Sequence, residues 1–75
     1  MLTINLRDFP NWLREYRKSQ KITQNRLATS AEISVYTISR IERGEYNPTL
    51  DTIIKIADAL VRHKEAEEII AHITK

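Results

Sequence analysis

Hydrophobic positions between residues 23 and 44 recur at the spacing of two short helices, each preceded by a residue that can cap a helix start. Thr23 and Ser34 carry hydroxyl groups that can accept hydrogen bonds from the unpaired backbone amides of a first helical turn. Two apolar residues flank each cap at the spacing of a hydrophobic staple, Ile22 with Leu27 and Ile33 with Ile38. Because only about eight residues remain for the first helix, it must pack against its neighbour to be stable. The pattern predicts a helix-turn-helix over about residues 23–43.

The chain before this unit is predicted to contain an extended arm and one helix. Leu2, Ile4 and Leu6 alternate with polar residues, at the period of a strand. Because a lone strand is not stable, the arm either lies on its own body, which we favour, or pairs with another chain. Asp8 is expected to cap a helix from about Phe9 to Gln20. The apolar side of this helix would consist of Trp12, Leu13 and Tyr16.

Two further helices are predicted after residue 47. Pro48 and Thr49 open a fourth helix, and a fifth is expected over about residues 64–74. Apolar residues at helical spacing assign the core side of the fourth helix to Leu50, Ile53, Ile54, Ala57 and Leu60. The fifth helix has a stripe of its own, formed by Ala66, Ile69, Ile70 and Ile73. The sequence therefore predicts an all-α, compact five-helix bundle with a short extended N-terminal arm.

The second helix of the helix-turn-helix separates into a buried and an outward face on a helical wheel. Ile38 and Ile41 define the buried side. The outward side carries Tyr36, Ser39, Arg40 and Arg43, and Val35 lies at the helix start. Arginine can fork onto guanine, serine can bond bases or phosphate, and tyrosine can contact phosphate or a thymine methyl group. These residues could also be no more than the solvated surface of a helical protein, but their coincidence with the two-helix pattern favours nucleic-acid contact.

Four segments together resemble the phage repressor and Cro family of helix-turn-helix domains, also called XRE-like. They are YRKSQKITQNRLA, ISVYTISRIERG, YNPTL and LDTIIKIADAL, and they span residues 16–60. The resemblance implies a lambda-repressor-like fold and a sequence-specific transcriptional regulator that reads operator half-sites in the major groove of double-stranded DNA. It also implies a homodimer on a palindromic operator, because one recognition helix reads few bases. In relatives the last helix either completes the bundle or forms the dimer interface.

The resemblance implies roles for individual positions. Val35, Tyr36 and Arg40 match base-contacting positions, and Ser39, which lies between them, is assigned to the same set. Gln24, Arg43 and Asn47 match phosphate-contacting positions, and the cap Thr23 is assigned to that set as well. Arg17 and Glu42 match an internal ion pair that braces the first helix against the recognition helix. For Glu42 this structural role is preferred, because a carboxylate facing DNA would be repelled and unpairing a buried charge is costly.

This chain departs from its relatives at two positions where they usually have glycine. Lys21 follows the first helix, and Glu32 lies in the turn between the two reading helices. A left-handed backbone there would cost a residue other than glycine roughly 1–2 kcal/mol. Either the turns avoid that conformation or the chain tolerates the strain. Gly44 is retained, at a position suited to stop the recognition helix.

Composition and charge are compatible with this interpretation. The 75 residues fit a single domain, residues 1–75, and the absence of cysteine excludes disulfides and thiolate metal sites. No apolar run approaches the length of a membrane span, so we expect a cytoplasmic, nucleoid-associated protein. Residues 7–43 carry eight Lys or Arg against four Asp or Glu, whereas residues 44–75 carry four against six. The basic half contains the proposed reading unit, although chance could also produce this asymmetry in a short chain.

The sequence offers little for catalysis. Its two histidines, His63 and His72, have no partners at the spacing of a triad or metal site, and a single glycine leaves no phosphate-binding loop. We expect no enzyme activity, no cofactor and no metal. A regulator of the phage repressor, Cro or restriction-modification controller type, acting on RNA polymerase, is favoured. The alternative is an antitoxin or another protein-binding module that holds a toxin, for which this short chain leaves little length.

Overall fold

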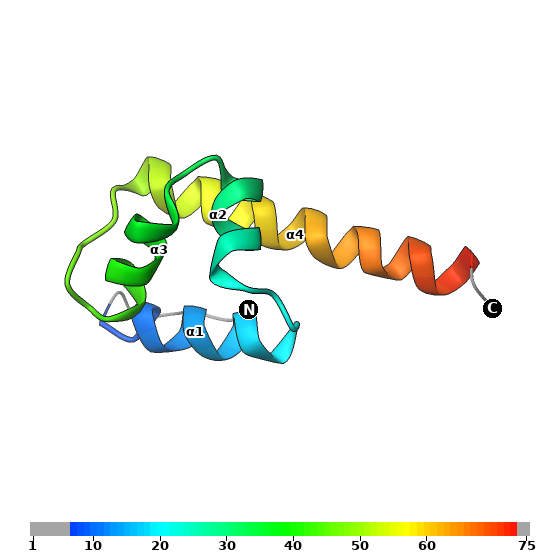
Figure 1. Ribbon diagram of the computed structural model, residues 1–75, viewed down its shortest axis with the longest axis horizontal. Coiled ribbons are helices and arrows are strands. Elements are labelled where there is room, and N and C mark those ends of the chain that lie inside the picture. The colour runs from blue at the N-terminus through cyan, green and yellow to red at the C-terminus, as the bar shows by residue number, and fades with distance from the viewer. Residues whose placement is uncertain (1–6, 74–75) are drawn as a thin grey trace.

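The computed structural model describes residues 7–73, which form four α-helices joined by short turns (Figure 1). The helices are α1 (Phe9–Ser19), α2 (Gln24–Ala31), α3 (Val35–Glu42) and α4 (Leu50–Ile73). Helix α2 packs on both α3 and α4, and α1 packs on α3. The side chains fully buried between them are Leu13, Leu27, Ile38, Ile41 and Ile56. The all-α prediction is confirmed for this part of the chain, whereas the predicted arm at residues 2–6 lies outside the described residues.

The predicted starts of α2 and α3 are confirmed. The Thr23 hydroxyl accepts a hydrogen bond from the backbone amide of Arg26 at 3.0 Å, and the Ser34 hydroxyl accepts one from Thr37 at 3.0 Å. The predicted cap by the Asp8 side chain is wrong, since this side chain accepts no hydrogen bond from the first turn. Its backbone has helical angles, whereas Thr23 and Ser34 have the extended backbone typical of a capping residue.

Helices α1, α2 and α3 end in the same way, with one residue in the left-handed region. Lys21, Glu32 and Gly44 have φ of 58°, 59° and 73°. The amide of the following residue then bonds back to the last turn of the helix. These backbone hydrogen bonds run from the Ile22 amide to the Arg17 carbonyl at 3.0 Å, from Ile33 to Ala28 at 3.0 Å and from Glu45 to Arg40 at 2.9 Å. They form Schellman motifs, so the chain adopts the left-handed conformation at Lys21 and Glu32 and tolerates its cost.

Replacing Glu32 by glycine is expected to stabilise the domain by about 0.5–1 kcal/mol. Glycine removes the steric cost of the left-handed backbone, and part of this gain is lost to the greater freedom of glycine in the unfolded chain. Thermal unfolding followed by circular dichroism would show a melting temperature raised by a few degrees. Glu32→Gln is the control, because it removes the charge and keeps the β-carbon. An equal gain in both variants would assign the effect to charge and contradict the conformational explanation.

Two isoleucines connect these helix ends to the next helix starts. Ile22 completes the stop of α1 and directly precedes the cap Thr23, and Ile33 has the same relation to α2 and Ser34. Ile22 is buried, and Ile33 packs half-buried against the core. Each isoleucine therefore serves both helices on either side of its turn.

The predicted count of five helices is wrong, because the fourth and fifth are one continuous helix. Helix α4 runs for 24 residues, and its junction at residues 61–63 contains neither glycine nor proline. Two contacts one turn apart span the junction, an ion pair with Arg62 Nε 3.2 Å from Asp58 Oδ2 and a longer contact with His63 Nε2 3.8 Å from Glu67 Oε1. Its start is as predicted, since the Thr49 hydroxyl accepts a hydrogen bond from the Thr52 amide at 3.2 Å.

The predicted core side of α4 is correct only in part. Leu60 is buried and Ile53 is half-buried, but Leu50, Ile54 and Ala57 are exposed. The buried side is formed instead by Ile56, Ala59 and Leu60. Both sides of the helix carry apolar residues at helical spacing, so periodicity alone could not decide which of them packs on the body. Beyond the body, every residue from 64 to 73 is exposed, and this projecting segment extends away from the other helices (Figure 1).

Candidate nucleic-acid interface

Helix α3 presents one face to the core and the opposite face to solvent. Ile38 and Ile41 are fully buried on the inner face. On the outer face Tyr36 has 65% of its surface exposed. The remaining outer residues are Val35 and Arg43, which are exposed, and Ser39 and Arg40, which are half-buried. The four predicted base-contacting residues thus gather on the outer side of one short helix.

Arg40 is held between two aromatic rings on this face. Its guanidinium carbon lies 5.6 Å from the ring centroid of Tyr36 and 5.6 Å from that of Tyr46. A cation over an aromatic ring is attracted to the face of the ring, so the two contacts orient the guanidinium. Tyr36 precedes Arg40 by one helical turn, which sequence spacing could have shown. Tyr46 lies in the loop beyond α3, where periodicity gives no signal, and sequence reasoning missed it.

Arg43 forms an ion pair with a carboxylate at the end of α3. Its Nε lies 3.0 Å from Glu45 Oε2, and its Nη2 donates to Glu45 Oε1 at 3.2 Å. Both side chains are about half exposed, so solvent screens the pair and its contribution to stability is small. Arg43 can therefore exchange this carboxylate for another anion.

The other predicted phosphate-contacting residues have different surroundings. Thr23 and Asn47 are exposed, and the Thr23 hydroxyl keeps its proton for a further acceptor while it caps α2. Gln24 is half-buried, and its side-chain amide donates to Glu42 Oε1 at 3.0 Å. Gln24 therefore lies at the start of α2 and also bonds to Glu42, whose buried carboxylate pairs with Arg17.

Arg17 and Glu42 form a buried, two-point ion pair between α1 and the last turn of α3. Arg17 Nε donates to Glu42 Oε2 at 2.7 Å, and Arg17 Nη2 donates to Oε1 at 3.0 Å. The third nitrogen, Nη1, donates to the backbone carbonyl of Ile22 at 2.8 Å. The arginine thus connects α1, the turn before α2 and the end of α3, which fixes the position of α3 relative to the body.

Arg14 adds a second contact from α1 to the same end of α3, and sequence reasoning missed it. Its Nη1 donates to the backbone carbonyl of Glu42 at 3.3 Å, and its Nη2 donates to Asn11 Oδ1 at 2.6 Å. Carbonyls in the last turn of a helix lack intrahelical partners and carry partial negative charge, so an arginine there is favourable.

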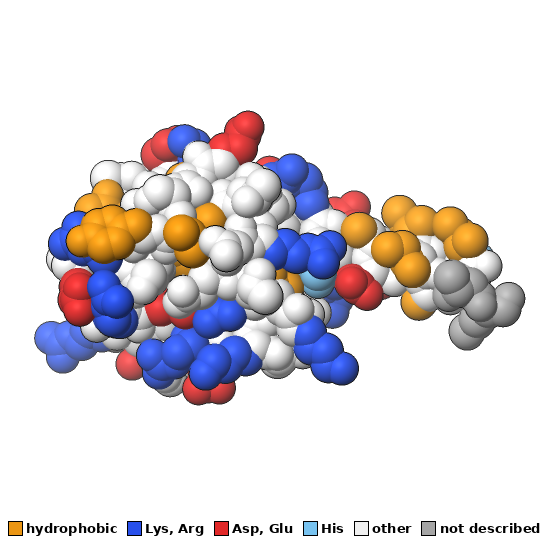
Figure 2. All heavy atoms as spheres, in the orientation of Figure 1, with side chains coloured by type: hydrophobic (Ala, Val, Ile, Leu, Met, Phe, Trp, Pro, Cys, Tyr) orange, Lys and Arg blue, Asp and Glu red, His pale blue; other side chains and the backbone are white. Residues whose placement is uncertain are grey.

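Basic side chains gather along the edge of the molecule formed by α1, below α3 in the view of Figure 2. This distribution suits a polyanion such as the phosphate backbone of DNA. Across residues 7–73 there is no group of three or more His, Cys, Asp or Glu residues that could hold a metal ion. No helix within the same range is both long and apolar enough to cross a membrane.

Helices α2 and α3 each have eight residues and a capped start, and a three-residue turn joins them. The outer face of α3 is exposed. These features define a helix-turn-helix domain. The chain belongs to the helix-turn-helix family, because the family model described as "Helix-turn-helix" matches residues 13–60. The predicted membership of the phage repressor and Cro class is confirmed by this match together with repressor relatives.

Several relatives have similar sequences. The chain is 42% identical over 48 residues to the immunity repressor protein of Bacillus phage phi105, covering 64% of this chain and 33% of that protein. It is 43% identical over 56 residues to the HTH-type transcriptional repressor RghR of Bacillus subtilis, covering 73% of this chain and 42% of that repressor. A transcriptional regulator of Methanocaldococcus jannaschii is 43% identical over 47 residues, with 71% of its length covered. The match thus spans less than half of the length of each of the two repressors. No solved structure matches the chain.

Proposed function

We propose that the chain is a sequence-specific DNA-binding transcriptional regulator that inserts α3 into the major groove of an operator. The observation that carries the proposal is Arg40, held between two tyrosine rings on the exposed face of α3. A guanidinium oriented before binding loses less freedom when it forks onto a guanine. Two relatives, one from Bacillus phage phi105 and one from Bacillus subtilis, are named as repressors, which supports the same function.

The other residues around α3 fit the two kinds of DNA contact. Val35 and Tyr36 supply apolar surface for thymine methyl groups, and Ser39 supplies a hydroxyl for a base edge. Phosphate contacts would come from the start of α2 and the end of α3, through Thr23, Gln24, Arg43 and Asn47. In this arrangement Arg43 leaves Glu45 for a phosphate oxygen.

The short length of α3 supports a homodimer on a palindromic operator. A helix of eight residues reaches only a few base pairs, so two copies reading two half-sites are needed for a specific site. A dimer bound near a promoter would act by occluding RNA polymerase or by contacting it.

Selection of bound sequences from a random double-stranded DNA pool tests the proposal. Recovery of a sequence with two-fold symmetry would support both the sequence-specific reader and the dimer. If the folded protein enriches no sequence, the proposal is wrong, and a protein-binding module such as an antitoxin becomes the better explanation of the fold.

Replacing Arg43 by alanine is expected to weaken binding to random and to selected DNA by the same factor. Loss of one phosphate contact reduces the slope of log affinity against log salt by about 0.9. Fluorescence anisotropy titrations at several salt concentrations measure this slope. Glu45→Gln is the matched control, since it frees Arg43 and is expected to strengthen binding. An unchanged slope in Arg43→Ala would remove Arg43 from the phosphate contacts.

A further inference from the structure

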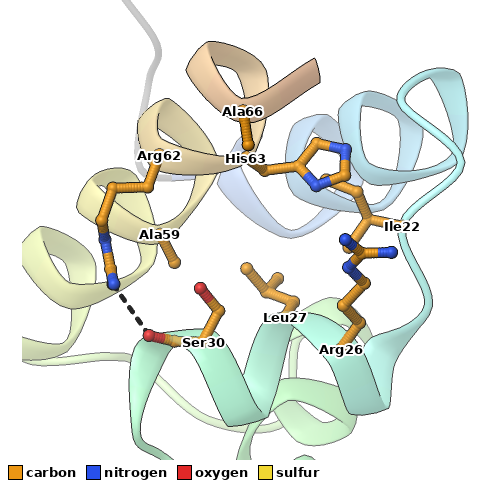
Figure 3. A pocket seen from close by; sticks show the side chains of 8 residues that line it. All are labelled: Ile22, Arg26, Leu27, Ser30, Ala59, Arg62, His63 and Ala66. Atoms are coloured by element: carbon orange, nitrogen blue, oxygen red, sulfur yellow. Dashed lines mark hydrogen bonds between the residues drawn. The ribbon is translucent and has the colours of Figure 1, made fainter. Parts of the chain in front are cut away.

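A groove between α2 and α4 contains polar side chains that neither the fold nor the proposed DNA contacts use (Figure 3). Its volume is about 200 Å³. Its apolar walls are formed by Leu27 and Ala59, together with Ile22 and Ala66. No residue of α3 lines it, and neither does any residue assigned to DNA contact.

The imidazole of His63 lines this groove and forms no hydrogen bond with any residue from 7 to 73. Only 10% of the side chain is exposed, and its Nε2 is buried. The Glu67 Oε1 atom lies 3.8 Å from Nε2, which is longer than a hydrogen bond. Buried polar groups in folded proteins nearly always have a partner, because leaving one unpaired is unfavourable. His63 therefore has hydrogen-bonding capacity that a bound molecule could use.

Arg26 supplies an unpaired positive charge at the same end of the groove. Its side chain is exposed, and within residues 7–73 its guanidinium forms neither a hydrogen bond nor an ion pair. Figure 3 shows this guanidinium and the His63 imidazole at one end of the groove, the first from α2 and the second from α4.

Arg62, at the opposite end, is already engaged. Its Nη2 donates to the Ser30 carbonyl at 2.8 Å, and its Nε lies 3.2 Å from Asp58 Oδ2. These contacts hold Arg62 across the groove, so it closes that end and has its charge paired. The groove thus has one closed end, an apolar middle and one end with unpaired donors.

We propose that the groove binds a small carboxylic acid, with the carboxylate between Arg26 and His63 and the apolar body against Leu27 and Ala59. A guanidinium can donate two parallel hydrogen bonds to a carboxylate, and an imidazole N–H can donate a third. The proposal does not depend on the proposed function, because the groove and the DNA-reading face have no residue in common.

The size of the groove limits the ligand. An apolar cavity of roughly 150 Å³ holds benzene, so a groove of about 200 Å³ has room for one ring or a short branched chain in addition to a carboxylate. A bare inorganic anion would leave the apolar walls unfilled, and a long-chain acid would meet Arg62. The ligand class is therefore a monocarboxylate with about four to six further carbon atoms.

The charges around the site are compatible with an anion. Asp58 pairs with Arg62 at the closed end. Glu67 is the carboxylate beside His63, but it does not line the groove and its side chain is 60% exposed, so water screens its repulsion. Arg26, in contrast, lines the groove directly.

Titration of the isotope-labelled full chain with benzoate, followed by NMR without DNA, tests the site. We expect saturable shifts at the groove with a dissociation constant of about 1 mM or tighter. The imidazole signals of His63 should shift, whereas those of His72, which is exposed in the projecting segment, should not. No saturable shift, or a shift of His72 alone, would overturn the proposal.

Two control probes test the two parts of the ligand. Benzyl alcohol keeps the ring without the charge, and acetate keeps the charge without the ring. Both are expected to bind at least about 10-fold more weakly than benzoate. Equal binding of benzyl alcohol would refute the carboxylate site, and equal binding of acetate would show an adventitious ion only.

Replacing Arg26 by glutamine is expected to weaken benzoate binding at least about 10-fold, to the level of benzyl alcohol, because the two-point contact is lost. Lys55→Gln is the matched control, since it removes a positive charge from an exposed position of α4 outside the groove. Native affinity in Arg26→Gln, or an equal loss in Lys55→Gln, would overturn the proposal.

Replacing His63 by leucine separates a binding role from a structural one. The variant is expected to keep or raise the melting temperature, because a buried group without a partner is removed, and to bind benzoate several-fold more weakly. His72→Leu is the control and should change neither quantity. A lower melting temperature in His63→Leu would assign the imidazole to the fold, and unchanged benzoate binding would remove it from the site; either result would refute the proposal.

Discussion

Replacing Arg17 by alanine is expected to lower the free energy of unfolding by about 3–5 kcal/mol, which would unfold much of the protein or lower its melting temperature by more than about 10 °C. The buried Glu42 carboxylate would lose both of its arginine hydrogen bonds and keep only the one from Gln24. The Ile22 carbonyl would lose its side-chain donor as well. Denaturant titration followed by circular dichroism measures the change.

Two further variants distinguish the cost of leaving the Glu42 charge unpaired from the cost of losing any contact made by α1. Arg14→Ala removes a longer, partly buried contact to the same end of α3 and is expected to cost far less. The double variant Arg17→Met with Glu42→Leu removes both charges and is expected to recover much of the lost stability, since a buried pair can be replaced by apolar residues at little cost. An Arg17→Ala variant that melts like the native protein would show that the pair contributes nothing to the fold.

Replacing Arg40 by alanine is expected to weaken binding to the selected operator by about 1–3 kcal/mol, or roughly 5- to 150-fold, and to relax the preference at one base position. The folding stability should remain close to native, because within residues 7–73 the guanidinium meets two aromatic rings and donates one long hydrogen bond, to the Glu45 carbonyl at 3.4 Å. Titrations against the operator and its single-base variants measure both effects. If Arg40→Ala keeps the full preference at every position, another residue reads the base.

Tyr46→Leu provides the companion measurement for this prediction. Leucine keeps an apolar side chain at a half-buried position but removes one of the two rings that orient Arg40. We expect a smaller loss of affinity than for Arg40→Ala, with the preferred base unchanged, because Arg40 would still make the contact from a less ordered position. A changed base preference would instead show that Tyr46 itself contacts DNA.

The starts of α2, α3 and α4 could be predicted because their signals are local. Thr23, Ser34 and Thr49 each accept a hydrogen bond from an amide three residues later, and such a contact depends on little beyond the residues themselves. The same reasoning failed at Asp8, where the backbone angles removed the cap. The sequence alone does not decide whether Lys21 and Glu32 adopt left-handed turns, because propensity gives the cost of that conformation but not whether the packing on either side outweighs it.

The errors in α4 and the missed site residues arose from tertiary structure. Hydrophobic spacing located the helix but could not choose between its two apolar sides, since that choice depends on where α2 packs. Similarly, the wheel placed Tyr36 and Arg40 on one face, whereas Tyr46 and Arg14 reach their partners across a loop and from another helix. The Arg17–Glu42 contact, 25 positions apart in the chain, could be expected only from the family resemblance.

The shared use of Ile22 and Ile33 determines where the chain tolerates a change in length. Each residue ends one helix and directly precedes the cap of the next, so an insertion at residues 21–22 or 32–33 would separate a helix stop from the cap that follows it. One extra residue within α3 would turn its remaining side chains by about 100° and take them off the DNA-reading face. Around Asn47 and Pro48 no residue has such a double role among the contacts described. We therefore expect the fold to accept a loop extension or cleavage site there and to reject one in the two turns, whereas an extension beside Asn47 is expected to weaken the proposed phosphate contact.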